Sequence, residues 1–343
     1  MATPDRDLAP LVIVIVTLDG VRWHEVFEGV DPKLAKERGV AEGERVSATE
    51  LMPNLHAIIA THGAALGAPG HGAAISASGP NFVSLPGYAE LLSGRRNTSC
   101  HDNQCPGSDS ATIVDEFSAG SKLERPDAAV ITSWADIARV VSRDTQSAII
   151  STGRHGGATR AWFVRDAEER QLLVRAEAAN PAPGNGDFRP DALTAALALH
   201  HLRAHPTRFT FIGFGEPDEF GHQGNYAGYL MALREADARL GQIDAELQRL
   251  AARGTRTALF ITADHGRAAN FNDHGAKFPE SARVWLVASG SAVLSGGCLS
   301  APSPRRLADL APTVREIAGL PPDLDIAAGT PLVELLRATD LPH

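Results

Sequence analysis

The chain has 343 residues, of which 43% are hydrophobic and 21% charged, a composition typical of a globular protein with a large buried core. Its formal net charge is −9 at pH 7, and no run of lysine and arginine could follow a phosphate backbone, which argues against a nucleic acid as partner. The three cysteines are too few for a disulfide scaffold to be the main source of stability.

The first predicted element is a strand. Leu11–Leu18 is a continuous apolar run, rich in β-branched residues, that ends at Asp19, as is typical of a buried parallel strand. The run is far too short to cross a bilayer, no basic segment precedes it and no cleavage site follows it. We therefore expect no membrane segment. We expect a cytoplasmic protein as the chain stands, or a periplasmic or secreted one if an export signal has been removed.

Further apolar runs predict strands, and periodic segments between them predict helices. The predicted strands are residues 128–132, 148–151, 209–214, 257–262 and 284–288. The predicted helices are residues 53–61, 85–92, 191–204, 226–253 and 305–318. In the segment 226–253, apolar residues recur at three- and four-residue steps, the pattern of an amphipathic helix packed on a sheet. This alternation predicts an α/β fold, with a mostly parallel, mixed central sheet and helices on both faces.

We expect one catalytic domain over residues 1–343. Residues 97–183 are the least periodic part, and a small lid beside the site is expected within residues 97–190. Residues 180–190 are rich in proline, glycine and asparagine, which predicts a surface loop or the boundary of a small lobe. Cys100 and Cys105 lie close in sequence; they could form a loop disulfide in an exported protein or remain free thiols.

Side chains of the kind that ligate metal ions follow three of the predicted strands and a later loop. They are Asp19, Asp218, His222, Asp264, His265 and His274. Because the carboxyl ends of parallel strands meet at one edge of a sheet, we expect these side chains to converge. Imidazole nitrogens and carboxylate oxygens are the ligands that zinc favours. The sequence therefore predicts two sets of three ligands: Asp218, His222 and His274 for one ion, and Asp19, Asp264 and His265 for the other.

A tight loop that opens a helix contributes Ser84 to the same edge. Two metal ions about 3.5–4 Å apart can clamp the attacking and leaving oxygens of a displacement at phosphorus, and a metal ion lowers the pKa of a serine hydroxyl. The helix amides after Ser84 are expected to face a phosphate oxygen. A small phosphate ester is the expected substrate, because two dications would reverse the local potential of an acidic protein.

The order Asp, Ser, Asp-x-x-x-His, Asp-His and His resembles the alkaline phosphatase superfamily. That superfamily includes phosphatases, nucleotide pyrophosphatase/phosphodiesterases, sulfatases and cofactor-independent phosphoglycerate mutases. The resemblance spans most of the chain. It implies an alkaline-phosphatase-like fold and two divalent ions, zinc before manganese. It also implies the ligand sets named above, with Ser84 as the nucleophile that becomes a phosphoserine.

The segment after Ser84 looks most like the nucleophile loop of the phosphodiesterase branch, although that branch has threonine more often at this position. The same branch carries an Asp-Asn pair, which implies that Asn103 donates to a phosphoryl oxygen. Sulfatases need arginine where Tyr88 stands, and phosphoglycerate mutases need a larger second domain than the stretch from Ser84 to Asp218 provides. Monoester and diester substrates both stay open. The alternatives are intramolecular phosphoryl transfer, as in a mutase, and a metal-binding homologue without catalysis.

Three more residues are candidates for contact with the substrate. Arg154 could grip the terminal oxygens of a monoester, Arg267 could face the substrate or support the ligands, and Tyr88 could line the leaving-group pocket or serve helix packing. A separate histidine group near the end of the helix 191–204 also has metal-ligating side chains. It consists of His200, His201 and His205. At that position histidine interacts favourably with the helix dipole, and we favour this structural interpretation. The sequence makes no prediction of oligomeric state.

Overall fold

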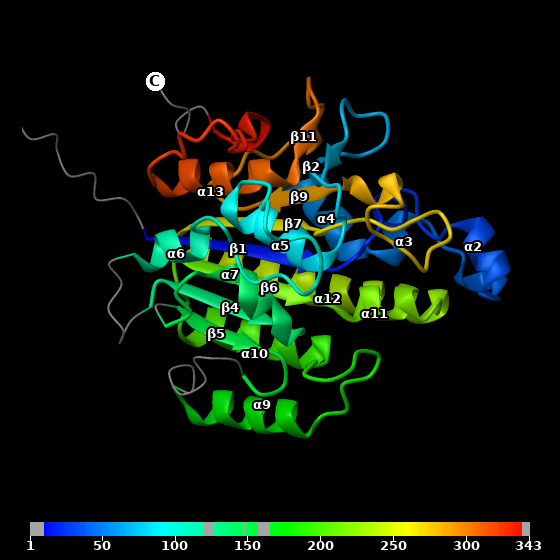
Figure 1. Ribbon diagram of the computed structural model, residues 1–343, viewed down its shortest axis with the longest axis horizontal. Coiled ribbons are helices and arrows are strands. Elements are labelled where there is room, and N and C mark those ends of the chain that lie inside the picture. Colours follow the sequence, from blue (N-terminus) through cyan, green and yellow to red (C-terminus); the bar gives the residue numbers. More distant parts are fainter. Residues whose placement is uncertain (1–9, 120–125, 147, 157–164, 338–343) are drawn as a thin grey trace, which may run out of the picture.

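The computed structural model describes residues 10–119, 126–146, 148–156 and 165–337 (Figure 1). Its centre is an eight-stranded sheet with the strand order β10-β2-β9-β7-β1-β6-β4-β5. The strands, in chain order, are β1 (Leu11–Leu18), β2 (Gly63–Leu66), β4 (Ala128–Thr132), β5 (Ile149–Thr152), β6 (Phe209–Phe214), β7 (Arg256–Thr262), β9 (Leu286–Ser289) and β10 (Gly297–Cys298). A small second sheet contains β3 (Ile75–Ser76), β8 (Arg283–Val284) and β11 (Arg305–Arg306).

The five strands from β7 to β5 are parallel to their neighbours, whereas β9 is antiparallel to both β7 and β2. All eight residues of β1 are buried, and the strand pairs with β6 on one side and β7 on the other. A strand covered on both faces and both edges can be apolar throughout, which explains its unbroken hydrophobic run. The predicted fold class, a mixed and mostly parallel sheet, is confirmed.

Helices cover both faces of the sheet. On one face α12 (Tyr226–Ala251) packs on β7 and α4 (Pro53–Thr61), and α10 (Asp191–Ala204) packs on β6 and β4 with α9 (Ala167–Ala178) outside it. The other face carries α5 (Ser84–Ser93), α6 (Ile113–Ser118), α7 (Ala138–Val141) and α13 (Leu310–Ala318). Of these helices, α5 contacts the other three. The remaining helices are α1 (Trp23–Phe27), α2 (Pro32–Glu37), α3 (Ala48–Leu51) and α11 (Glu216–His222). No described helix is long and apolar enough to cross a bilayer.

Two predicted elements were wrong in detail. The strand predicted at 284–288 is divided, because Trp285 separates β8 in the small sheet from β9 in the central sheet, and its buried indole N–H donates to the backbone oxygen of Val21 at 3.0 Å. The helix predicted from residue 305 begins only at Leu310, because the residues before it pair with β3 or form a 3-10 turn. It ends at Gly319, as predicted, in a left-handed conformation.

The segment 97–190 contributes β4 and β5 to the central sheet, so most of it belongs to the core of the fold. Part of the loop predicted at 180–190 is also buried. Arg189 is fully covered and its guanidinium donates to the backbone oxygens of Thr132 and Ser151, at the ends of these two strands. A lid within 97–190 stays a prediction.

Candidate metal centre

The predicted ligands lie at the carboxyl ends of three neighbouring parallel strands. Asp19 follows β1 directly, Asp218 and His222 lie on α11 just after β6, and Asp264 and His265 follow β7. Because β1 lies between β6 and β7, these segments, about 200 residues apart in sequence, end side by side. The structure thus brings the predicted side chains together.

The first group of ligand atoms comes from Asp19, Asp264 and His265, and these atoms all lie within 4.8 Å of one another. His265 Nε2 is 3.4 Å from Asp19 Oδ1 and 3.4 Å from Asp264 Oδ2, and all three residues are buried. His265 Nδ1 lies 2.8 Å from the backbone oxygen of Gly266. A carbonyl can only accept, so Nδ1 carries the proton of a neutral ring and Nε2 presents a lone pair to the two carboxylates.

This arrangement fits a divalent cation. Oδ2 of Asp264 is buried without any hydrogen-bond partner among the described residues, although such atoms are rarely left unpaired in proteins. A metal ion would satisfy this oxygen and remove the repulsion between the facing lone pairs. The Nδ1 contact of His265 with a backbone oxygen is the support that a metal-ligating histidine commonly has.

The second group joins Asp218, His265 and His274, whose ligand atoms also lie within 4.8 Å of one another. His222 Nε2 is 2.9 Å from Asp218 Oδ2 and 3.1 Å from His274 Nε2. His274 Nδ1 lies 2.9 Å from the backbone oxygen of Phe82, so its Nε2 is directed toward the carboxylate. The predicted trio of Asp218, His222 and His274 is therefore adjacent in space, and His265 lies between the two groups.

Ser84 is the first residue of α5, and its hydroxyl faces the first group. Ser84 Oγ is 3.4 Å from Asp19 Oδ1 and 3.4 Å from His265 Nε2. The helix packs very closely against the end of β7, since a Cβ at Gly87 would lie 2.5 Å from the backbone oxygen of Asp264. This close approach, which requires glycine, places the start of α5 over the ligands.

The expectation that the helix amides after Ser84 face a phosphate oxygen was wrong for two positions. The amide of Leu85 donates to Asn103 Oδ1 at 3.0 Å, and Pro86 has no N–H. The same contact places Asn103 beside Ser84, as the resemblance implied. With its oxygen engaged, the amide group of Asn103 keeps its N–H donors for another acceptor. A Cys100–Cys105 disulfide closes the loop that carries Asn103.

Burial and neighbouring charges shift the pKa values of the ligands. Burial, reinforced by Asp264 and Asp218, raises the pKa of Asp19 well above its ordinary value, and burial with Asp218 does the same to Asp264. Burial alone would also raise the pKa of Asp218, but the Arg267 guanidinium, His222 and His274 together outweigh it and hold that pKa well below the usual range. Burial lowers the pKa of His265. Without a metal ion, the charged forms of two of the three carboxylates, those of Asp19 and Asp264, are therefore disfavoured.

Two of the predicted substrate contacts instead support ligands. Tyr88 is fully buried, and its hydroxyl donates to Asp19 Oδ2 at 2.9 Å, so the structure does not place it along a substrate pocket. Arg267 is buried and donates to Asp218 Oδ1 and to the backbone oxygens of Phe271 and Asn272. The spacing gave a signal for Tyr88, because this residue lies four positions after Ser84 and therefore on the same helix face.

Arg154 lies apart from both groups in every contact that the structure describes for it. Its guanidinium donates to the backbone oxygen of Ala179 at 3.0 Å, and its amide donates to Asp187. Gly20 was not singled out from the sequence, yet its amide donates to Asp264 Oδ1 at 3.1 Å and orients that carboxylate. Its position directly after Asp19, in a left-handed conformation, was the available signal.

Comparison with known proteins agrees with this architecture. Residues 186–320 match the family model described as the Metalloenzyme superfamily. The fold is similar to the phosphonate monoester hydrolase of Agrobacterium radiobacter, with 15% identity and a TM-score of 0.55 over 95% of this chain and 77% of that one. It is also similar to the wild-type alkaline phosphatase PafA, with 9% identity and a TM-score of 0.55 over 98% of this chain and 100% of that one. The fold is therefore alkaline-phosphatase-like.

Curated proteins that match part of the chain include 2,3-bisphosphoglycerate-independent phosphoglycerate mutases. The protein of Herpetosiphon aurantiacus is 30% identical over 169 residues, which cover 47% of this chain and 30% of the mutase. The chain therefore matches about a third of the length of these relatives. The similar proteins thus include hydrolases as well as mutases.

Proposed function

We propose that the chain is a two-metal hydrolase of phosphate esters that acts through a covalent phosphoserine at Ser84. The observation that carries this proposal is the position of Ser84 Oγ, 3.4 Å from both Asp19 Oδ1 and His265 Nε2 at the start of a helix. A serine serving only as a structural residue has no need of a buried place facing two ligand-type side chains. The arrangement matches the nucleophile and metal set that the sequence predicted.

In this proposal Asp19, Asp264 and His265 hold one divalent ion, and Asp218, His222 and His274 hold the other. Zinc suits this donor set, and manganese is the second choice. When bound, such ions supply Lewis acidity, which lowers the pKa of a hydroxyl and neutralises charge on phosphoryl oxygens. The remaining chemistry belongs to the side chains of this chain.

Ser84 Oγ forms a bond to phosphorus as the bond from phosphorus to the leaving oxygen breaks, which yields a phosphoseryl ester and an alcohol. Its hydroxyl proton faces Asp19 Oδ1 before the attack. Water then cleaves the phosphoseryl ester, regenerates the Ser84 hydroxyl and releases phosphate, or a monoester if the substrate was a diester. The N–H donors of Asn103, held beside Ser84 by the Leu85 amide, stabilise a phosphoryl oxygen.

Intramolecular phosphoryl transfer is a second candidate, and the identity to phosphoglycerate mutases is the observation that favours it. A mutase returns the phosphoryl group to another hydroxyl of the same substrate and releases no free phosphate. The short match to the mutases, 30% of the length of one of them, favours hydrolysis. We further propose that residues 1–343 act as one catalytic domain and that the phosphodiesterase branch is the nearest in substrate type.

Kinetics on three chromogenic esters test the proposal. The zinc-loaded protein should release nitrophenol from p-nitrophenyl phosphate, bis(p-nitrophenyl) phosphate or p-nitrophenyl methylphosphonate, and the preferred ester identifies the monoester or diester preference. Ser84→Ala should lower kcat by about 10³-fold or more, because no other hydroxyl replaces the nucleophile. Ser300→Ala, at an exposed serine, is the matched control and should retain full activity.

Acid quenching of the reaction followed by peptide mass spectrometry should find one phosphoryl group on Ser84. Full activity of Ser84→Ala would remove this residue from the mechanism. No turnover of all three esters by a protein with verified metal content would overturn the hydrolase proposal. A rearranged phosphorylated product without free phosphate would favour the mutase instead.

A further inference from the structure

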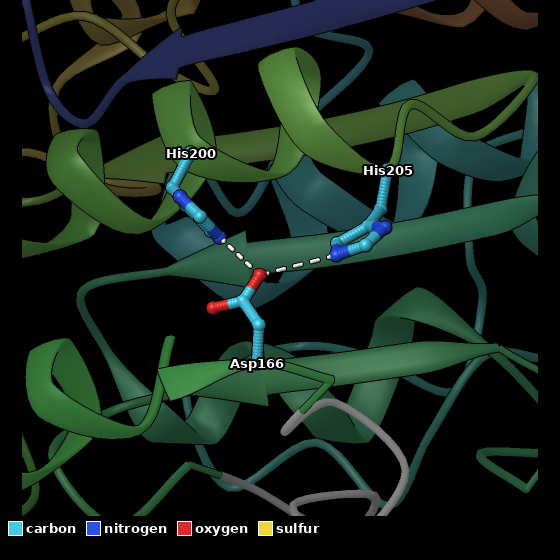
Figure 2. A group of neighbouring side chains, drawn as sticks. All are labelled: Asp166, His200 and His205. Carbon is cyan, nitrogen blue, oxygen red and sulfur yellow. Dashed lines mark hydrogen bonds and ion pairs between the residues drawn. The ribbon is translucent and has the colours of Figure 1, made fainter. Parts of the chain in front are cut away.

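A second cluster of metal-ligating side chains lies between α9 and α10, away from the candidate metal centre. Asp166, the residue that caps the start of α9, points toward His200 and His205, and Figure 2 shows the three side chains converging. Asp166 Oδ2 is 2.8 Å from His200 Nε2 and 3.2 Å from His205 Nε2. One potential ligand atom of each residue lies within 4.8 Å of the other two.

The carboxylate of Asp166 is fixed before any ligand arrives. Its other oxygen, Oδ1, accepts the backbone N–H groups of Glu168 and Glu169, both at 2.9 Å, and so caps α9. Oδ2 is thereby directed toward the two imidazoles. The histidines are held as well, because His200 lies on α10 just before its last turn and His205 caps its end.

A second carboxylate supports His200 from behind. His200 Nδ1 is 3.2 Å from Glu168 Oε2, so both nitrogens of this ring face carboxylate oxygens. Metal-ligating histidines commonly donate the N–H of their other ring nitrogen to a carboxylate. Here that nitrogen is Nδ1, so the proton is fixed on Nδ1 and Nε2 is left free to bind a metal ion. The side chain of His200 is only 11% exposed, which shields the contact from water.

We propose that Asp166 Oδ2, His200 Nε2 and His205 Nε2 form a binding site for a divalent transition-metal ion of the zinc class. Two imidazoles and one carboxylate form a common zinc ligand set, and a fourth position remains for water. Of the three histidines in this part of the sequence, His201 is not a ligand, because its buried ring turns inward to Thr207 Oγ1 at 3.2 Å.

The site is distant from Ser84 in the fold. The first residue of α10, Asp191, accepts the amides of Gly215 and Glu216 just after β6, at the edge where the candidate metal centre lies. His200 and His205 lie toward the opposite end of this helix, nine and fourteen residues after Asp191, which places even His200 about 13 Å further along it at 1.5 Å per residue. A metal ion there would tie the start of α9 to the end of α10.

These two helices form walls of a surface cavity of about 920 Å³, whose lining includes Glu168, Leu172, Ala196 and His200. The ion would therefore brace this cavity and hold α9 against α10, a role independent of the proposed hydrolysis. In the alternative no metal ion binds here. His200 Nε2 and His205 Nε2 each carry a proton, and both donate a hydrogen bond to Asp166 Oδ2.

The zinc content of the protein distinguishes a bound metal ion from a purely hydrogen-bonded cluster. We compare the wild-type protein with His200→Ala/His205→Ala. Each protein is stripped with a chelator and equilibrated with the same excess of zinc, and its bound zinc is measured by elemental mass spectrometry. We expect the double variant to bind one zinc ion fewer per chain than the wild type, with unchanged turnover. His71→Ala, at an exposed histidine, should bind as many ions as the wild type. Equal zinc content in the double variant and the wild type would overturn the proposal.

Asp166→Asn gives a second test that does not depend on the double variant folding. Asparagine caps a helix as well as aspartate does, so α9 keeps its start while the site loses its charged ligand. We expect zinc to bind to this site at least about tenfold more weakly than in the wild type. In chelator the wild type and Asp166→Asn should unfold at similar temperatures. Added zinc should raise the unfolding temperature of the wild type more than that of Asp166→Asn. An equal rise in both would contradict the site.

Discussion

At the scale of single residues, the candidate centre depends on side chains that hold the ligands in place. Tyr88 donates to Asp19, Gly20 to Asp264 and Arg267 to Asp218, so each carboxylate has a fixed neighbour. Such contacts orient ligands and set their basicity, and their loss weakens metal binding without removing a ligand.

Tyr88→Phe tests this support at Asp19. The ring would keep its packing against Phe211, while the buried carboxylate would lose its hydroxyl donor. We expect zinc affinity to fall by about 10–100-fold, as for the loss of other supporting contacts, in a competition titration with a chromogenic chelator. Tyr226→Phe is the matched control, because its hydroxyl donates to Glu25, and it should bind zinc with wild-type affinity. Equal loss in both variants would point to general destabilisation.

Arg267→Met should destabilise the protein much more without metal than with it. Removing one partner of a buried ion pair costs about 3–5 kcal/mol, because the other charge stays buried and unpaired. A metal ion beside Asp218 would supply the missing positive charge, and only the lost bonds to Phe271 and Asn272 would then remain as a cost. Urea unfolding with chelator and with zinc measures the difference. The same loss of stability under both conditions would refute a metal ion beside Asp218.

The ligand residues themselves could be predicted from the sequence, since each is an Asp or His placed just after a strand or a short loop. For Tyr88 and Arg267 the sequence left a substrate contact and another role open, because both residue types suit either. Only burial and hydrogen-bond direction distinguish these roles, and both depend on packing between segments far apart in the chain. The candidate second site shows the same limit, since the helix dipole explained His200 and His205 until Asp166 of another helix was seen beside them.

At the scale of elements, the strands and helices with strong periodicity were predicted well. The helices Pro53–Thr61 and Asp191–Ala204 have the predicted bounds, and β1, β4 and β6 have theirs. The missed elements carry weak patterns: β2 is the short Gly-Ala-Ala-Leu segment Gly63–Leu66, and α9 is a charged helix whose only apolar residues larger than alanine are Leu172, Leu173 and Val174. The division at Trp285 could not be predicted, because a change of sheet leaves the apolar run almost unbroken.

The loop from residue 97 to residue 105 places Asn103 beside Ser84, and a disulfide closes it. We expect Cys100→Ser/Cys105→Ser to lower kcat roughly tenfold, because a misplaced donor stabilises the phosphoryl oxygen less well. Asn103→Ala removes the donor and sets the upper limit of the effect. Steady-state kinetics of both variants measure this. An unchanged kcat in the cysteine variant, or a fall larger than that of Asn103→Ala, would contradict a positioning role for the loop.

At the scale of the whole molecule, stability should depend on metal and pH together. The raised pKa values of Asp19 and Asp264 mean that the metal-free folded protein binds protons more tightly than the unfolded chain does. Their contribution to folding is complete below pH 4, near the ordinary pKa of aspartate, and is lost as pH rises through the raised values. Burial lowers the pKa of His265, so protons compete less with a metal ion for its ring nitrogen than they do at an exposed histidine.

Metal binding requires these carboxylates as anions, so the ion must displace their protons, and this becomes easier as pH rises. We expect the rise in unfolding temperature caused by zinc to grow between pH 5 and pH 7.5, as measured by scanning calorimetry with chelator and with zinc. Asp264→Asn should reduce the rise at every pH. A zinc effect that shrinks as pH increases would contradict carboxylate ligation at this centre.

The central position of β1 has a consequence for how the protein is made. This strand leaves the ribosome well before its neighbours, since the residues that pair with it, such as Phe209 beside Ile13, emerge about 200 residues later. At a synthesis rate of about 5–20 residues per second, the most apolar segment of the chain waits roughly 10–40 s for a neighbour. During that time it is a target for chaperones and for association with other nascent chains, and the yield of native protein in cells depends on how well it is shielded.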